Sequence, residues 1–175
     1  SGAGGSTLGF VQAGYRIEGA LELDKNSAET FERNFKLKPV IEDASKFDFV
    51  AWSRVLGDVD VLVGCPPCQG FSRLKHNGDN DPRNSLVYVY INAVKAFKPK
   101  IAVFENVRGF ISSAKGKFFQ DLIDKLNKLG YKISWSVMNA ADYGVPQIRR
   151  RAIVIASLKE KVCFPPKTHG RPNEK

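Results

Sequence analysis

Residues 59–68, VDVLVGCPPC, join a short apolar run to a loop that contains two prolines and two cysteines. The run Val59–Val63 predicts a buried strand that ends near Gly64. Proline fixes the backbone φ angle, so Pro66 and Pro67 predict a rigid loop directly after that strand. In parallel α/β sheets, ligands bind beyond the carboxyl ends of the strands. The stretch therefore predicts a strand whose carboxyl end carries a rigid, cysteine-containing loop at a ligand site.

Further strands and helices alternate around this stretch. Apolar runs predict strands at Ile17–Leu23, Val40–Ile41, Ile101–Phe104, Lys132–Val137 and Ala152–Ser157. Helical spacing of apolar side chains predicts four helices. The first starts near Leu8, and the second runs to Phe35 after a cap at Asn26 or Ser27. The other two cover Leu86–Phe97 and Phe118–Leu129. The alternation predicts a three-layer, mostly parallel α/β sheet, with helices on both faces and an antiparallel edge from the last two strands.

The composition of the 175 residues is that of an ordinary globular chain, with 43% hydrophobic and 26% charged side chains. The length fits one domain or little more. No run of about 18 apolar residues occurs, so no membrane span is expected. The Gly-rich start carries no secretory signal, and three cysteines, an odd number, argue against a disulfide framework. We therefore expect a protein of a reducing, intracellular compartment.

Charge is distributed unevenly along the chain. Residues 1–90 carry a formal net charge of −2, whereas residues 91–175 carry +11. Such an excess of Lys and Arg is typical of a solvated surface or of a face that binds a polyanion. Charge alone does not choose between these two interpretations.

The Gly-rich start is followed by a carboxylate at the end of the next predicted strand. Gly2–Gly4 lacks the third glycine of a dinucleotide fingerprint, but a Gly-rich turn before a helix still lets a ligand approach the backbone closely. Glu22 can accept hydrogen bonds from ribose hydroxyls, and Asp24 competes for that role. Asp43 is a weaker candidate for a contact with adenine. The pattern indicates a nucleotide-like cofactor.

Cys65 and Cys68 have the spacing of a zinc or dithiol site. A structural zinc site needs four ligands, and the rest of the chain offers only Cys163, His76 and His169. A redox pair is the second alternative, because the spacing also fits a strand-to-helix turn. We favour the third, a single nucleophilic thiol at Cys68, which lies nearer the start of the next helix. Cys65 and Cys163 are expected to be buried structural thiols.

Five stretches, in this order along the chain, together resemble the motifs of the cytosine carbon-5 DNA methyltransferases. They are Ser1–Gly5, Pro67–Ser72, Glu105–Val107, Val137–Pro146 and Gln147–Arg151. The resemblance covers nearly the whole chain. It implies the Rossmann-like fold of S-adenosylmethionine-dependent methyltransferases, with S-adenosyl-L-methionine as cofactor. It also implies double-stranded DNA as substrate, with the target cytosine flipped out of the helix.

The resemblance implies a role for each matching residue. Cys68 adds its thiolate to carbon 6 of cytosine, and Glu105 hydrogen-bonds ring nitrogen 3 and the amino group. Arg151 helps to hold Glu105 and the base, and Arg149 lies near the phosphates. Supporting contacts with the substrate are implied for Gln69, Ser72, Arg83, Asn106 and Gln147. The residues that match the cofactor site are Ser1, Gly2, Ala3, Gly4, Gly5, Glu22, Leu23, Asp43, Ala44, Pro66 and Leu86. No metal is implied.

The same resemblance predicts the organisation of the chain. Residues 1–164 correspond to the catalytic domain without its first strand, and residues 165–175 to a linker toward a target-recognition domain. We expect that domain in a missing segment or a second chain, and we expect the protein in the cytoplasm of a prokaryote or the nucleus of a eukaryote. A tRNA cytosine-5 methyltransferase is one alternative, although Gln69–Ser72 favours DNA. A catalytically inactive regulatory homologue is the other, and Cys68, Glu105 and Arg151 together argue against it.

Overall fold

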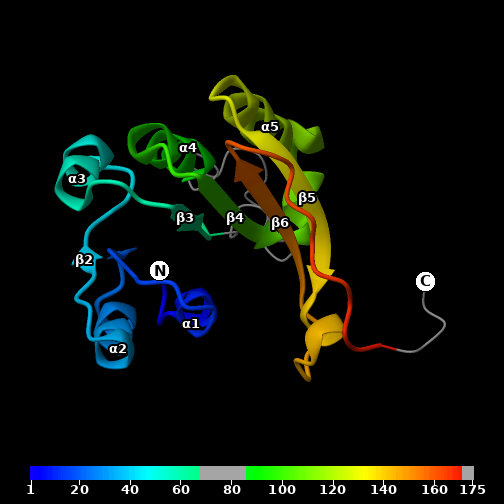
Figure 1. Cartoon of the computed structure of the whole chain (residues 1–175), viewed down its shortest axis with the longest axis horizontal. Helices are drawn as coiled ribbons and strands as arrows, with labels where there is room; N and C mark the ends of the chain where they lie inside the picture. The colour runs from blue at the N-terminus through cyan, green and yellow to red at the C-terminus, as the bar shows by residue number, and fades with distance from the viewer. Residues whose placement is uncertain (68–85, 171–175) are drawn as a thin grey trace. The chain divides into compact units, whose positions relative to one another are not determined.

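The computed structural model describes residues 1–67 and 86–170, and the chain divides into two compact units (Figure 1). The first unit contains residues 1–59 and 96–98, and the second contains residues 60–95 and 99–175. The predicted boundary between residues 164 and 165 stays a prediction. Among the described residues, no helix is long and apolar enough to cross a membrane.

The first unit contains three helices and a pair of short strands. They are α1 (Gly5–Gln12), β1 (Leu21–Glu22), α2 (Lys25–Phe35), β2 (Val40–Ile41) and α3 (Phe49–Leu56). Strands β1 and β2 are parallel, with Leu21 opposite Val40. The expected strand at Ile17–Leu23 is thus only two residues long, and α1 begins at Gly5 instead of near Leu8.

Two side chains cap helices of this unit. Asp24 accepts a hydrogen bond from the backbone N–H of Ser27 at 2.7 Å, so the predicted cap of α2 at Asn26 or Ser27 was wrong. The Oδ1 atom of Asp24 therefore has a structural role at the start of α2, and the choice between Glu22 and Asp24 as the ribose contact stays a prediction. Asp48 caps α3 in the same way, accepting from the N–H of Ala51 at 2.9 Å. The sequence analysis did not predict α3.

The second unit contains a four-stranded sheet with two long helices. Its elements are β3 (Val61–Gly64), α4 (Leu86–Phe97), β4 (Ile101–Val107), η3 (Arg108–Ile111), η4 (Ser113–Gly116), α5 (Lys117–Lys128), β5 (Lys132–Asn139), η5 (Ala140–Tyr143) and β6 (Arg150–Ser157). The strand order is β3-β4-β6-β5. Strands β3 and β4 are parallel, and β6 is antiparallel to both β4 and β5. The α/β fold is confirmed, and the last two strands do form an antiparallel pair at one edge. The edge strand itself is β5. Strand β6, which runs antiparallel to its two neighbours, lies between β4 and β5.

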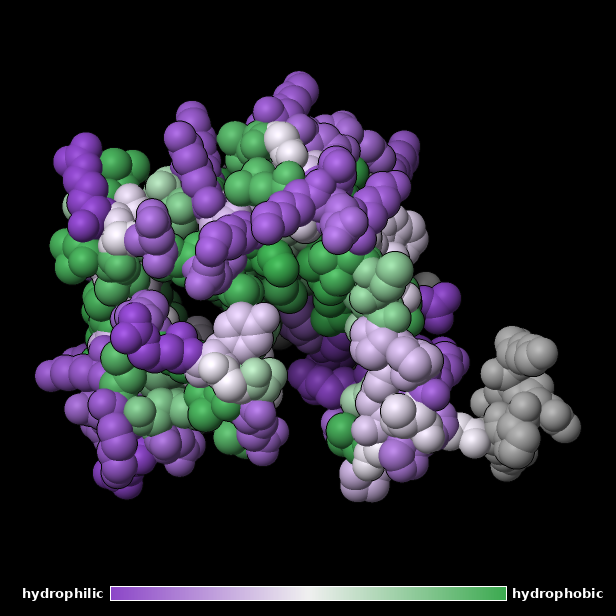
Figure 2. Space-filling view, viewed as in Figure 1, coloured by the Kyte–Doolittle hydropathy of each residue, from purple (hydrophilic) through white to green (hydrophobic). Residues whose placement is uncertain are grey.

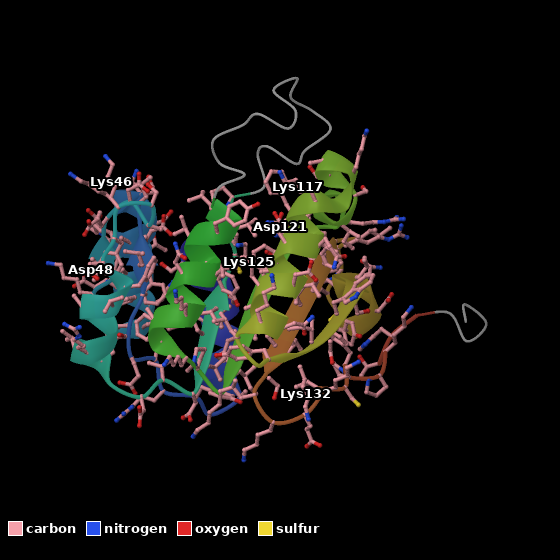
Figure 3. All side chains as sticks on the ribbon, turned by 90° about the horizontal axis from the view of Figure 1, so that it is seen from above. Lys46, Asp48, Lys117, Asp121, Lys125 and Lys132 are labelled. Atoms are coloured by element: carbon pink, nitrogen blue, oxygen red, sulfur yellow. The ribbon has the colours of Figure 1, made fainter. Side chains whose placement is uncertain are left out.

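The core of the second unit lies between this sheet and α4 and α5, which run side by side in front of the strands in Figure 3. Side chains alternate between the two faces of a strand. Ala102, Phe104 and Asn106 of β4 are accordingly buried, at 1%, 0% and 2% exposure, whereas Glu105 between them points to the other face. Phe104 packs against Tyr90 of α4, with ring centroids 5.2 Å apart.

Hydrophilic side chains cover much of the visible surface over the second unit's helices and strand ends (Figure 2). The exposed residues of this unit include Lys95, Lys125, Lys128 and Lys132. Of the described basic residues from 91 to 170, all except the half-buried Arg151 are exposed, so the basic excess of this part of the chain lies on the surface. Exposed basic side chains are expected both of a solvated surface and of a face that binds a polyanion, so their placement does not decide between these two interpretations.

Candidate functional site

The pairing of β4 with β6 brings Glu105 and Arg151 together. Val107 lies opposite Arg151 in the antiparallel register, so Glu105 and Arg151 are diagonal neighbours on one face of the sheet. The Nε atom of Arg151 is 2.8 Å from Oε1 of Glu105, and the two side chains are 25% and 27% exposed. A partly exposed carboxylate held by a guanidinium is available to hydrogen-bond a polar ligand.

Asn106, on the opposite face of β4, is 2% exposed and contacts the loop that follows β3. Its Nδ2 atom donates to the carbonyl oxygen of Pro66 at 3.4 Å, and its Oδ1 atom accepts from the N–H of Val107 at 2.8 Å. Both ends of the amide are thus used within the chain. Asn106 ties the end of β4 to the Pro-Pro loop, and its contact with substrate stays a prediction.

Gln147 and Arg149 lie on an exposed segment that leads from η5 into β6. The backbone N–H of Gln147 donates to the carbonyl of Val145 at 2.7 Å. The backbone N–H of Arg149 donates to Oδ1 of Asn139 at 3.0 Å, and its carbonyl accepts from Ala140 at 3.0 Å. The side chains of Gln147 and Arg149 are thus exposed, while backbone hydrogen bonds hold the segment that carries them.

The loop after β3 carries most of the remaining predicted substrate contacts. Cys68, Gln69, Ser72 and Arg83 lie outside the described residues. Pro66 is half-buried before that stretch, and Leu86 begins α4 after it. Cys65 and Cys163 are exposed, so the expectation that both are buried structural thiols was wrong.

In the first unit, the carboxylate of Glu22 accepts hydrogen bonds from the backbone of the Gly-rich start and from the two residues that follow Glu22. Its Oε2 accepts from the nitrogens of Ser1 and Gly2 at 2.9 and 2.5 Å. Its Oε1 accepts from the N–H groups of Leu23 and Asp24 at 2.9 and 3.0 Å. Burial raises the pKa of Glu22, but the bonds from Asp24, Ser1 and Gly2 outweigh burial and lower the pKa to about 2. Glu22 is therefore an ionised anchor for the loop.

The Glu22→Gln variant is expected to destabilise the protein most above pH 4.5, the ordinary pKa of this carboxyl. A depressed pKa gives stability that is complete above the unfolded-state value and is lost as the pH falls toward the folded-state value of about 2. The measurement is the difference in urea midpoint between wild type and variant at pH 7, 4 and 3. Glu42→Gln, at an exposed carboxylate, is the control. A difference for Glu22→Gln that stays constant between pH 7 and pH 3 would contradict the expectation.

The residues around Glu22 fit a nucleoside-like cofactor. Gly2, at φ +59°, and Gly5 have open space where a Cβ atom would lie, so a ligand can approach the backbone there. Leu23, next to Glu22, is an apolar side chain with 65% exposure. The carboxylate of Asp43 accepts from the N–H and hydroxyl of Ser45, and these bonds lower its pKa. Ser1 and Ala3 are exposed and Ala44 is half-buried. An exposed apolar side chain, carboxylates and open backbone are the kinds of group that suit an adenosine.

Gly4 and Gly5 also have structural roles at the start of α1, independent of any contact with a ligand. Gly4 has φ +97° and precedes α1, and a Cβ atom there would lie 2.1 Å from the ring of Phe35. Only glycine fits a position with both constraints. Gly5 is the first residue of α1. The Gly-rich stretch is therefore a helix start that α2 contacts closely.

Sequence reasoning missed three residues around the site. Asn139 and Asp142 lie within the Val137–Pro146 stretch, but no role was assigned to either; an Asn and an Asp at a strand end are typical of turns that bond the backbone. Tyr90 packs so closely on Gly64 that a Cβ atom at Gly64 would lie 2.2 Å from the ring. A glycine at a strand end is typical of a site where another group packs closely, so Gly64 could have indicated this contact from the sequence.

Comparison with known proteins gives consistent matches. The sequence profile of the family described as C-5 cytosine-specific DNA methylase matches residues 1–175. The Type II methyltransferase M.FnuDI of Fusobacterium nucleatum is 38% identical over 161 residues, which is 91% of this chain and 46% of that protein. The Type II methyltransferase M.AquIA of Picosynechococcus sp. is 35% identical over 191 residues, covering 99% of this chain and 76% of that protein. The chain thus spans less than half of M.FnuDI but three quarters of M.AquIA.

The fold is shared with solved methyltransferases. The structure of the Entamoeba histolytica methyltransferase EhMeth superposes with a TM-score of 0.77 at 24% identity, covering 97% of this chain and 55% of that one. At this identity the likeness concerns the fold. It confirms the methyltransferase-type α/β architecture expected from the sequence.

Proposed function

Because the chain belongs to the C-5 cytosine-specific DNA methylase family, we propose that the protein methylates carbon 5 of cytosine in double-stranded DNA, with S-adenosylmethionine as methyl donor. The observation that carries the proposal is the 2.8 Å ion pair between Glu105 and Arg151. It lies at the end of β4, where Asn106 bonds the carbonyl of Pro66, two residues before Cys68. The proposed nucleophile therefore follows a loop that is tied to the strand carrying the proposed acid.

The chemistry needs these residue types. Carbon 5 of cytosine is a poor nucleophile, so the ring is activated covalently. Glu105 takes up a proton when the base binds. The thiolate of Cys68 then forms a bond to carbon 6 while protonated Glu105 gives that proton to nitrogen 3, which places electron density on carbon 5. The cofactor supplies the electrophilic methyl group that carbon 5 takes. Loss of the methyl group would leave the cofactor as a neutral thioether, and nitrogen 3 returns its proton to Glu105. A base then removes the hydrogen of carbon 5, the carbon 6–sulfur bond breaks, and the thiolate is restored.

Other side chains orient these groups in the proposal. Arg151 holds the carboxyl group of Glu105 against the base, and Arg149 contacts a phosphate. Gln69, Ser72, Arg83 and Gln147 provide further substrate contacts. The cofactor residues are the Ser1–Gly5 stretch, Glu22 and Leu23, Asp43 and Ala44, Pro66 and Leu86. Recognition of the DNA sequence is assigned to a segment or second chain beyond residues 1–175.

A trapping experiment tests the function. The intact protein is mixed with S-adenosylmethionine and duplex DNA that contains 5-fluorocytosine, and a denaturant-stable complex is sought. Fluorine at carbon 5 blocks the final elimination, so the enzyme is expected to stay bonded to the base. The complex is expected to vanish in Cys68→Ala and to survive in Cys65→Ala, the matched control at the neighbouring cysteine.

The other outcomes separate the alternatives. A complex with 5-fluorocytosine tRNA but with no duplex DNA would replace the proposal with the tRNA enzyme. No complex with either nucleic acid would favour a regulatory homologue. A complex that is lost in Cys65→Ala but kept in Cys68→Ala would reassign the nucleophile.

A further inference from the structure

The segment after β6 folds back onto η5, the short helix that precedes the arginine-bearing loop. The backbone N–H groups of Thr168 and His169 both donate to the carbonyl oxygen of Asp142, each at 3.0 Å. The hydroxyl of Tyr143 donates to the carbonyl of Pro165 at 3.1 Å. Residues 165–169 are thus bonded to η5 at both ends, and we call this contact the clasp; the red end of the chain reaches η5 in Figure 1.

The imidazole of His169 adds a packing contact to the clasp. Gly144, which ends η5, has φ +91°, and a Cβ atom there would lie 2.9 Å from Cε1 of His169. A side chain at residue 144 would be strained by its backbone and would press on the ring. The glycine therefore lets the His169 ring lie directly against the start of the loop that leads to Arg149.

The side chain of Asp142 extends the clasp toward Arg149. Its Oδ2 lies 3.0 Å from Nζ of Lys167, within the clasp. Its Oδ1 accepts from Nδ2 of Asn139 at 3.3 Å. Oδ1 of Asn139 in turn accepts the backbone N–H of Arg149 at 3.0 Å. A chain of contacts therefore runs from Lys167 through Asp142 and Asn139 to the backbone of Arg149.

The loop that receives these contacts is held by backbone hydrogen bonds near its start, such as Gln147 to Val145 at 2.7 Å, and by Asn139 and Ala140 at Arg149. Residues 144–150 are all exposed, so apolar packing does not hold them. Downstream, Arg151 is fixed by its pairing with Val107 and Met138 in the sheet. Upstream, Asn139 and Ala140 bond the N–H and the carbonyl of Arg149. The side chain of Asn139 thus restrains an exposed loop at the residue that carries an arginine.

We propose that Asn139 and Asp142 are positioning residues for methyl transfer: they bond the clasp to the backbone of Arg149 and so fix Arg149, two residues before Arg151, at the site. The inference rests on the proposed function. Neither residue touches the reacting atoms in this assignment; both act through the arginine loop. Displacement of a positioned group by about 1 Å costs roughly a hundredfold in rate, so loosening this loop is expected to slow the reaction.

The test compares variants of the intact protein. Asn139→Ala is expected to lower the kcat for methylation of duplex DNA by about tenfold or more. The KM for S-adenosylmethionine and the thermal midpoint are expected to stay close to wild type, because the loop is exposed. Hydrogen exchange at the Arg149 amide is expected to speed up. Asn127→Ala, at an exposed asparagine of α5, is the matched control and is expected to change none of these readouts.

Two variants of Asp142 separate positioning from a general effect on folding. Asp142→Asn keeps the oxygen that accepts from Asn139 and is expected to keep most of the kcat. Asp142→Ala removes that oxygen and is expected to behave like Asn139→Ala. Equal kcat values for Asp142→Asn and Asp142→Ala would overturn the proposal. A faster-exchanging Arg149 amide in Asn139→Ala with wild-type kcat would overturn it as well.

Failure of the proposed function has a different signature. If the wild-type protein methylates no nucleic acid, the function is wrong, and hydrogen exchange still decides the placement of Arg149. An Arg149 amide that exchanges faster in Asn139→Ala than in Asn127→Ala would support the positioning role. Equal exchange in wild type and Asn139→Ala would overturn it.

Discussion

The Glu105→Gln variant is expected to lower the kcat of methyl transfer by about a hundredfold or more, because a positioned proton donor contributes roughly 10²–10⁴ to a rate. Glutamine preserves the volume of the side chain, and its amide oxygen can still accept from Nε of Arg151. It has no acidic proton to give to nitrogen 3 of cytosine. The loss should therefore fall on the chemical step and leave binding of S-adenosylmethionine nearly unchanged.

Single-turnover methylation of duplex DNA by the intact protein measures this effect. Glu160→Gln, at an exposed carboxylate after β6, is the control and should keep wild-type kinetics. Stability should change little, since the Glu105–Arg151 pair is about a quarter exposed and such pairs contribute only ~0–1 kcal/mol. A Glu105→Gln protein whose rate stays within about tenfold of wild type would remove Glu105 from the role of proton donor.

Arg151→Lys examines the partner of Glu105. Lysine keeps the charge but lacks the planar, multidentate guanidinium that holds a carboxylate in one orientation. A loss smaller than that of Glu105→Gln is expected, with the same preference for kcat over KM. The two losses should not add in the double variant, because Arg151 acts through Glu105.

The existence of the two parallel strands of the second unit, β3 and β4, was well predicted, although their exact ends were not. The strands predicted at Val59–Val63 and Ile101–Phe104 are observed at Val61–Gly64 and Ile101–Val107. They were recognised because apolar runs of this length followed by glycine or polar residues are typical of buried strands. Their parallel pairing follows from the helix between them. The position of Glu105 near the carboxyl end of β4 was therefore predictable, although the strand continues two residues beyond it.

The contact between Glu105 and Arg151 could not be predicted from local patterns. It depends on β6 inserting between β4 and β5, and strand order is a property of the whole sheet. The bond from Asn106 to Pro66 has the same origin, because it joins two strands that only the fold makes adjacent. Local signals also failed for α3, whose eight residues give too few turns for a clear apolar period.

The Gly64→Ala variant is expected to destabilise the protein by about 1–3 kcal/mol, the usual cost of overpacking a core. An alanine Cβ atom would lie 2.2 and 2.5 Å from Cδ2 and Cε2 of Tyr90. That ring cannot withdraw easily, since Tyr90 is 6% exposed and packs edge-on against Phe104. Urea unfolding of the wild type and the variant measures the difference.

The same substitution in two Tyr90 backgrounds shows whether the ring is the cause. Tyr90→Phe keeps the ring and removes a buried hydroxyl that has no hydrogen-bond partner among the described residues, so the cost of Gly64→Ala should persist there. Tyr90→Ala removes the ring, and the cost should fall because contacting residues are coupled. Equal costs in all three backgrounds would place the strain elsewhere. A cost seen only in the wild-type and Tyr90→Phe backgrounds would mean that the packing of one aromatic ring of α4 on Gly64 positions the end of β3. The same contact would then also position the Pro-Pro loop that follows β3.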